Sequence, residues 1–221
     1  MSGRVLFDND VALKISCYAL ISETLRATTL DGIAPAMLGV GRFVIRTRLS
    51  RAKNIADRER ARASFEHLLK SVSMVEPNEA ELSTAADLEA EANRRDLELD
   101  GGESQLLAIL ANRGCNLLLT GDKRAIVAMS VVAIAEAASR VACLEQLIAH
   151  LLVIEGTGIV RPRVCAEEQA DLAITLCFGC SMTVPPQDGD VLEGLASYTR
   201  HLGLSAPGVL LPGTDLTAIA A

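Results

Sequence analysis

Aromatic residues are scarce in this chain of 221 residues, because they make up only 3% of it and Trp is absent. Half of the residues are nevertheless hydrophobic, which excludes a chain that is disordered throughout. The core must therefore be built from Leu, Ile, Val and Ala. This composition favours helices and short buried strands over an aromatic-rich β-sandwich.

A long apolar run is also missing. The most apolar later segment, residues 125–135, ends at Glu136. It is far shorter than the roughly 20 residues that a membrane-spanning helix needs. The first ten residues lack the long apolar stretch of an export signal, and they include Asp8 and Asp10. We therefore expect a cytoplasmic protein without a membrane partner.

The third absence is an excess of basic charge, because the formal net charge is −7. Nucleic-acid binders usually carry a basic balance, since phosphate contacts supply most of their affinity. Any nucleic-acid function of this chain must therefore depend on a local basic patch beside an acidic metal site.

Short apolar segments alternate with helical patterns along the first two thirds of the chain. Strands are expected at Val5–Phe7, Cys115–Leu119 and Arg140–Leu144. Apolar residues at helical spacing run from Val11 to Leu25, and Asp10 is placed to cap this helix. Further helices are expected over residues 57–72, 78–93, 100–111 and 145–152, and from about residue 123. This alternation predicts βαβ units and an α/β fold with a parallel sheet.

The character of the sequence changes near Gly156. Beyond it, two helices are expected at Arg161–Phe178 and Asp190–Leu202, with a loop rich in Pro, Gly and Asp between them. The sequence therefore predicts a core domain over residues 1–155 and a helical C-terminal extension over residues 156–221.

Three acids stand where an α/β sheet presents ligands. Asp8 ends the first expected strand, Asp122 ends the strand at residues 115–119, and Glu103 lies in the first turn of a helix. Each has an ordinary structural alternative: Asp10 and Asp122 have the position of helix caps, and Asp100 with Glu103 has the spacing of a capping box.

Helical spacing favours a functional role for Glu103. It shares a helix face with Leu106, Leu107 and Leu110, so its carboxylate points to the core side. A buried carboxylate is costly without a cation or strong donors. A divalent metal shared with Asp8 and Asp122 would supply that cation.

Three segments in this order and spacing resemble PIN domains, the fold of the VapC-type toxin ribonucleases. They read VLFDNDVALK (residues 5–14), DGGES (residues 100–104) and LLLTGDKRA (residues 117–125), and the resemblance covers residues 4–152. It implies a Rossmann-like, three-layer domain with a parallel sheet. It also implies a Mg²⁺ or Mn²⁺ site in which Asp8, Glu103 and Asp122 fall on the family's acidic positions, and Asp10 is expected as a fourth, assisting metal ligand.

The function implied by this resemblance is a metal-dependent endoribonuclease that cleaves RNA phosphodiester bonds, of a toxin or defence type. The metal would polarise the phosphodiester and activate water for in-line attack. Hard divalent ions prefer oxygen ligands such as these carboxylates.

One feature departs from the family pattern. Residues 34–42 read APAMLGVGR, with Gly where the family has another acid. Glu23 is too far along the first helix to replace that acid. Glu145 follows the expected strand at residues 140–144 and is the better candidate.

A concentration of Arg residues follows this segment. Arg42, Arg46, Arg48 and Arg51 lead into Lys53, Arg58, Arg60 and Arg62. These residues form either a solvated helix face or a surface that guides the phosphates of RNA to the acidic pocket. Nearby aromatic residues are few, which favours contacts to the RNA backbone over base recognition.

The six cysteines are expected to be small buried residues with free thiols, because the chain shows no export signal. Cys177 and Cys180 form a single CxxC pair. A zinc site would need Cys165 and His201 as further ligands, so buried structural thiols are the preferred interpretation.

A second function of a different class stays open. In it the chain is a catalytically silent PIN-like subunit, and the C-terminal helices bind a partner protein. The absent acid favours this alternative, whereas the core-facing Glu103 favours the nuclease. RNA, an inhibitor or partner protein, and a second copy of the chain are the expected binding partners.

Overall fold

The centre of the protein is a parallel sheet of short apolar strands. The structure, a computed structural model, describes residues 3–216, and within them the five strands lie in the order β3-β2-β1-β4-β5, with every neighbouring pair parallel. The strands are β1 (Val5–Phe7), β2 (Ala36–Leu38), β3 (Ser73–Val75), β4 (Leu117–Thr120) and β5 (Val141–Cys143). Leu6 pairs with Ala36 on one side and with Leu118 on the other, so β1 is central.

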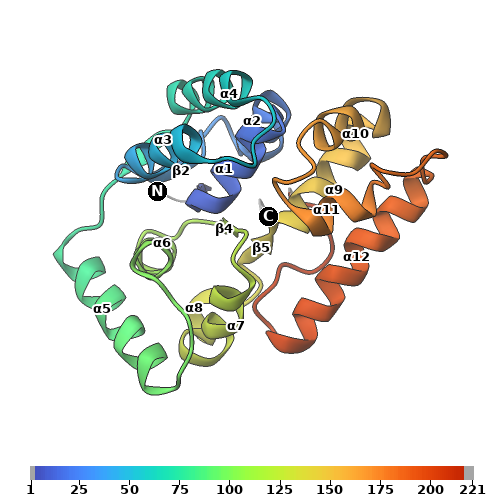
Figure 1. Cartoon of the computed structure of the whole chain (residues 1–221). Coiled ribbons are helices and arrows are strands. Elements are labelled where there is room, and N and C mark those ends of the chain that lie inside the picture. The colour runs from blue at the N-terminus through green and yellow to red at the C-terminus, as the bar shows by residue number, and fades with distance from the viewer. Residues whose placement is uncertain (1–2, 217–221) are drawn as a thin grey trace.

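Helices connect the strands and cover both faces of the sheet (Figure 1). In chain order the helices are α1 (Asn9–Cys17), α2 (Ile21–Thr28), α3 (Gly41–Arg51), α4 (Arg58–Ser71), α5 (Glu79–Arg94), α6 (Gly101–Asn112), α7 (Lys123–Val132), α8 (Ile134–Ala137), α9 (Leu144–Glu155), α10 (Thr157–Cys165), α11 (Leu172–Cys177) and α12 (Asp188–Ser205).

Side chains alternate across the strands and divide the core in two. Val5 and Phe7 belong to the cluster formed with α1–α4 and α9–α11. Leu6 points the other way, into the cluster formed with α6, α7 and α8. Two helical layers with a sheet between them are a three-layer, Rossmann-like α/β fold, as the sequence predicted.

The helical extension packs on the rest of the chain. Gly156 has a φ of +78° and separates α9 from α10, so the chain can turn sharply there. Val160, Ile174 and Leu195 belong to the same buried cluster as Val5 on β1. After α12 the chain runs beside β5, where the Leu211 amide donates to the Val141 carbonyl at 2.7 Å. The extension and the first 155 residues therefore share one core.

Several local predictions were wrong. The strands β2 and β3 were not predicted. The first helix is broken into α1 and α2, because Ala19 has a φ of +53° between them. The N-cap of α1 is Asp8 rather than Asp10, since the Asp8 carboxylate accepts from the Asn9 and Asp10 amides. The segment 161–178 forms parts of two helices, because a turn intervenes and Asp171 caps the second one.

The cysteine prediction holds for part of the set. Cys17, Cys115 and Cys143 are buried free thiols, and Cys177 is a partly buried free thiol. Cys165 and Cys180, however, form a disulfide, so the expectation of free thiols is wrong for these two.

In the described part of the chain, no helix is long and apolar enough to cross a membrane.

The disulfide should contribute measurably to stability. It closes a loop over a sequence separation of 15 residues, and such a bond restricts the unfolded chain. We expect Cys180→Ser to lower the free energy of unfolding by about 2 kcal/mol. Urea unfolding would measure this, with Cys177→Ser, a free thiol of the same segment, as the control. Equal losses in the two variants would contradict a role for the crosslink.

Candidate active site

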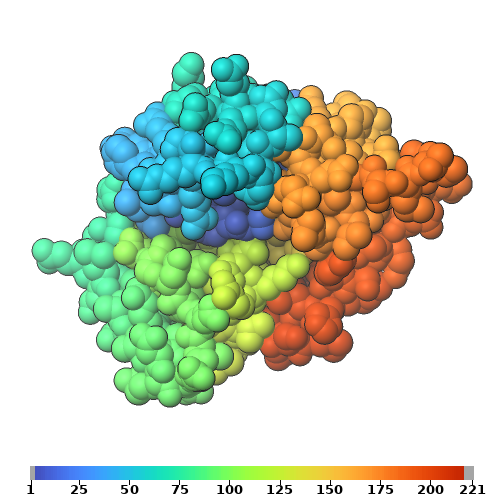
Figure 2. Space-filling view, in the orientation of Figure 1, coloured from blue at the N-terminus to red at the C-terminus, as the bar shows by residue number. Residues whose placement is uncertain are grey.

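A pocket opens at the carboxyl edge of the sheet, where β1 and β4 end. It has a volume of about 490 Å³, and the four acids predicted from the sequence all line it. Figure 2 shows the same face of the molecule hollowed between the N-terminal, middle and later segments of the chain. The lining residues are Asp8, Asn9, Asp10, Lys14, Arg48, Asp100, Glu103, Gly121, Asp122, Lys123, Arg124 and Asp171.

Asp8 lies at the base of this pocket. Its side chain is 6% exposed, and it accepts hydrogen bonds from the Asp10 amide and the Thr120 hydroxyl, both at 3.3 Å. Burial, together with the charge of Asp10, raises the pKa of Asp8 to about 6, although the backbone amides of Asn9 and Asp10 oppose both effects. No salt bridge to Asp8 is found in residues 3–216.

Glu103 is held in the first turn of α6 by a capping box with Asp100. Its carboxylate accepts from the Asp100 amide at 3.1 Å, so the structural interpretation of this pair is confirmed. Its side chain is also 5% exposed and faces the core side, as the helical spacing predicted. Burial, together with the charges of Asp100, Asp8 and Asp122, raises the pKa of Glu103 to about 8 against the opposing effect of the Asp100 backbone hydrogen bond.

Asp122 follows β4 and caps α7. One carboxylate oxygen accepts from the Arg124 amide at 2.8 Å, and the other lies 3.5 Å from the Arg124 guanidinium. Gly121 precedes it, and a Cβ at Gly121 would collide with the carboxylate of Asp10. A larger residue at this position would therefore have to displace the Asp10 carboxylate.

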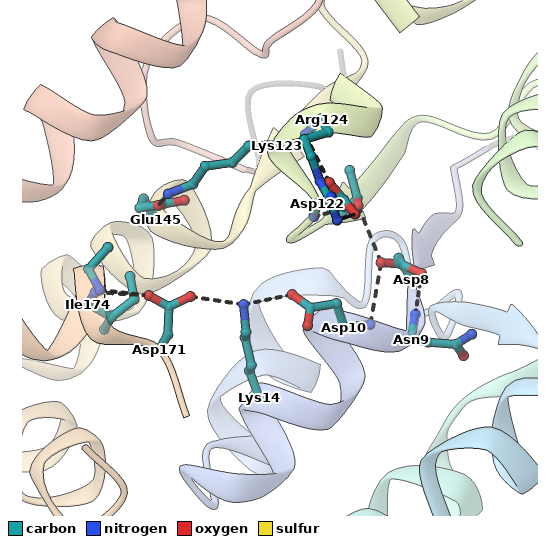
Figure 3. A network of polar contacts seen from close by, with 12 residues as sticks. Asp8, Asn9, Asp10, Lys14, Asp122, Lys123, Arg124, Glu145, Asp171 and Ile174 are labelled. Carbon is teal, nitrogen blue, oxygen red and sulfur yellow. Dashed lines mark hydrogen bonds and ion pairs between the residues drawn. The ribbon is translucent and has the colours of Figure 1, made fainter. Parts of the chain in front are cut away.

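Lys14 connects two acids across the pocket wall. Its ammonium lies 2.7 Å from Asp10 and 2.9 Å from Asp171, and Figure 3 shows it between them. Burial lowers the pKa of Lys14, but the two carboxylates outweigh burial and hold it above its usual value. Asp10 and Asp171 thus each have a cation, whereas Asp8 and Glu103 have none within the described part of the chain.

Sequence reasoning assigned no role to Asp171 or Lys14. Lys14 stands one helical turn after Asp10, so their ion pair could have been predicted from the spacing of four residues. Asp171 lies 157 residues beyond Lys14 and belongs to the extension, so no local pattern marks it. The acidic pocket is therefore built partly from the extension.

Other side chains fill the position at which the resemblance to PIN domains predicts a further acid. Gly39 and Gly41 follow β2 at the carboxyl edge. A Cβ at Gly39 would collide with the Glu76 carboxylate, and one at Gly41 with the Asn9 amide. A larger residue at either glycine would have to displace these neighbours.

Glu145 does not supply the absent acid. It is 2% exposed at the start of α9, and the Lys123 ammonium lies 2.5 Å from its carboxylate. Figure 3 shows Lys123 extending to Glu145 and away from Asp8. Glu145 is not among the residues that line the pocket, so its predicted use as a ligand is not supported.

The four Arg residues predicted to bind substrate lie on or beside α3 and differ in their surroundings. Arg48 lines the acidic pocket. Arg46 makes two hydrogen bonds to Glu66, at 2.7 and 2.8 Å, and Arg42 lies over the ring of Phe43. Arg51 is exposed at the end of α3. The structure therefore brings only Arg48 of these four to the acids.

The donor set suits a hard divalent cation. Asp8, Glu103 and Asp122 offer oxygen ligands, and burial and the neighbouring carboxylates raise the pKa values of Asp8 and Glu103. Within residues 3–216, however, no group of three His, Cys, Asp or Glu side chains is arranged to hold a metal ion. The acids line one pocket, and their side chains would have to move closer together to coordinate an ion.

Comparison with known proteins adds no relative. No protein-family model matches the chain, and no curated protein or solved structure matches it. Function must therefore be inferred from the pocket itself.

Proposed function

We propose that the protein is a metal-dependent endoribonuclease that uses Mg²⁺ or Mn²⁺. The observation that carries the proposal is a pair of buried carboxylates, Asp8 and Glu103, that have no cationic partner among residues 3–216 and line an open pocket. Asp122 lines the same pocket at the end of β4. An unpaired charge in such a position is costly, and a bound cation offsets that cost.

Each residue has a role in this proposal. Asp8, Glu103 and Asp122 hold the metal, and Asp10 assists by orienting Lys14 at the pocket wall. A bound divalent ion polarises a phosphodiester and lowers the pKa of water. Arg48 contacts the RNA backbone at the pocket, and Arg42, Arg46 and Arg51 extend that basic surface along α3.

The proposal is tested by incubating a mixed RNA pool with the protein and Mg²⁺ or Mn²⁺. We expect cleavage that EDTA stops and that Asp8→Asn reduces by about 100-fold or more, because even residues that only orient metal ligands are worth roughly 10–100-fold. Asp87→Asn, an exposed acid on α5, is the matched control. Cleavage by Asp8→Asn at the wild-type rate would show that the acidic pocket is not the active site.

A silent, PIN-like interaction subunit is the second candidate. Two observations favour it: the filled space at Gly39 and Gly41, and the lack of a ready set of metal ligands in the described residues. Leu172 and Leu176 on α11 are 61% and 70% exposed and would contact an inhibitor, another partner or a second copy. Absence of cleavage with either metal would favour this function.

A cytoplasmic location belongs to the proposal, since RNA is the proposed substrate. The disulfide between Cys165 and Cys180 opposes it, because the cytosol keeps most thiols reduced. Alkylation of free thiols in intact cells, followed by mass spectrometry, would show whether the bond exists there. An unmodified Cys165–Cys180 pair would point to an oxidising compartment.

A further inference from the structure

A second pocket adjoins the acidic one. It has a volume of about 520 Å³ and lies between α7, residues 96–98 and α12. Its apolar wall consists of Leu97, Val127, Tyr198 and Leu202. The C-terminal extension therefore contributes a large part of a cavity that the proposed cleavage site does not use.

Tyr198 gives this cavity a flat aromatic surface. The residue is 37% exposed and lines the second pocket. The Lys123 ammonium lies 5.1 Å from the centre of the ring. Nucleic-acid bases stack on aromatic side chains that line a groove with cations, because every base presents a π-face.

The two pockets share part of their wall. Lys123 and Arg124 line both of them. A ligand with a phosphate in the acidic pocket could thus extend past these two cations and place its next group against Tyr198. Base and phosphate are joined in this way in every nucleotide.

The charges at the rim define the occupant further. Asp96 and Glu98 line the second pocket together with Lys123 and Arg124. Both cations already have acidic partners, since Lys123 pairs with Glu145 and Arg124 with Glu98. Because the positive charges of both cations are neutralised by these partners and the carboxylates of Asp96 and Glu98 line the pocket, a second phosphate or an acidic peptide is disfavoured there. The two carboxylates suit a neutral ring whose amino groups donate hydrogen bonds.

We infer that this second pocket binds a base of single-stranded RNA, stacked on Tyr198, next to the phosphodiester in the acidic pocket. The inference rests on the proposed function for its substrate, but base binding itself needs no metal and no cleavage. It assigns base recognition to the extension, where the Arg-rich helix α3 provides contacts to the backbone.

Base binding is measured with adenosine in EDTA, with ribose as the control, by following backbone amide signals in NMR. We expect adenosine to shift the amides of residues 97–98, 123–127 and 198–202, and ribose to leave them unchanged. No shift with adenosine would overturn the inference. Shifts caused by leucine amide and not by adenosine would identify a protein-docking pocket and would also overturn it.

Stacking is tested with a single-stranded RNA of ten nucleotides in the Asp8→Asn background, which prevents cleavage at the proposed site. We expect Tyr198→Leu to weaken binding by at least about 5-fold and Tyr198→Phe to retain it, since stacking needs the ring and not the hydroxyl. Leu204→Ala, at an 84% exposed position on α12, is the matched control.

These experiments test base stacking on Tyr198 and cleavage at the acidic pocket independently of each other. RNA affinity that is unchanged in Tyr198→Leu overturns base stacking, whatever Asp8→Asn does to cleavage. Cleavage that is unchanged in Asp8→Asn overturns the proposed active site, and base binding at Tyr198 then still stands on the adenosine shifts. Thermal melting of the Tyr198 variants excludes unfolding as the cause of weaker binding.

Discussion

At pH 8 in EDTA, Glu103→Gln is expected to be more stable than the wild type by about 2–4 kcal/mol, because each unit of pKa shift corresponds to about 1.4 kcal/mol. Burial and the neighbouring carboxylates raise the pKa of Glu103 from 4.5 to about 8 in the folded protein. Gln is neutral at every pH and still accepts the Asp100 amide hydrogen bond of the capping box.

The stability of the wild type is expected to fall relative to that of Glu103→Gln as the pH rises. A carboxyl group whose pKa is raised by folding contributes stability below its unfolded pKa, and that stability is lost as the pH rises through the folded pKa. For Glu103 the loss falls between pH 4.5 and about 8, and for Asp8 between pH 3.8 and about 6. Wild type and Glu103→Gln should therefore be nearly equal at pH 5 and should diverge toward pH 8.

Urea unfolding at pH 5, 6, 7 and 8 checks this expectation. Glu79→Gln, an exposed Glu in the first turn of α5, is the matched control and should follow the wild type. Mg²⁺ or Mn²⁺ at pH 8 should stabilise the wild type more than Glu103→Gln, since a cation relieves the same repulsion. A Glu103→Gln variant that is less stable than the wild type at pH 8 would show that the ionised carboxylate is satisfied in the fold.

Glu167→Ala is expected to destabilise the protein by about 3–5 kcal/mol, as removal of one member of a buried charged network commonly does. Glu167 is 1% exposed, although it lies in the loop that the disulfide closes. Its carboxylate accepts from the amides of Ala56 and Asp57, each at 2.8 Å, and from Arg60 at 3.0 Å. The change to Ala leaves all three donors without this acceptor.

Glu168→Ala is the control, because this neighbouring carboxylate is exposed. Urea unfolding gives the difference in stability, and hydrogen exchange at Ala56 and Asp57 locates it. We expect faster exchange of both amides in Glu167→Ala only. If Glu167→Ala lost as little stability as Glu168→Ala, water would replace the Glu167 carboxylate with no loss in the free energy of unfolding.

The sequence predicted the parts of the fold that have clear local signals. β1 and β4 are apolar runs followed by Asp, and the helix that begins at Gly101 has both members of a capping box. β2 and β3 are three residues each. Ser73 and Met74 are only partly buried, so β3 shows no continuous apolar run. A strand without such a run is fixed by its neighbours in the sheet and not by its own sequence.

The residues of the candidate site also fall into those with a clear local signal in the sequence and those without one. Asp8, Glu103 and Asp122 could be assigned because strand ends and a helix face are readable in the sequence, and the structure places all three at one pocket. Asp171 could not be assigned, since its contact with Lys14 joins residues 157 positions apart. The partners of Arg46 and Glu145 depend likewise on how distant helices pack.

The run of the chain beside β5 has a consequence for how copies of the protein meet. The outermost strand of an open sheet presents unpaired backbone groups, to which a strand of another molecule can add. Here the Val141 amide donates to the Val209 carbonyl at 3.3 Å, and the Leu211 amide returns to the Val141 carbonyl. The Gln146 side chain fixes this segment through the Leu211 carbonyl at 2.8 Å. The extension therefore occupies the side of β5 on which intermolecular β-pairing, and aggregation from it, would otherwise begin.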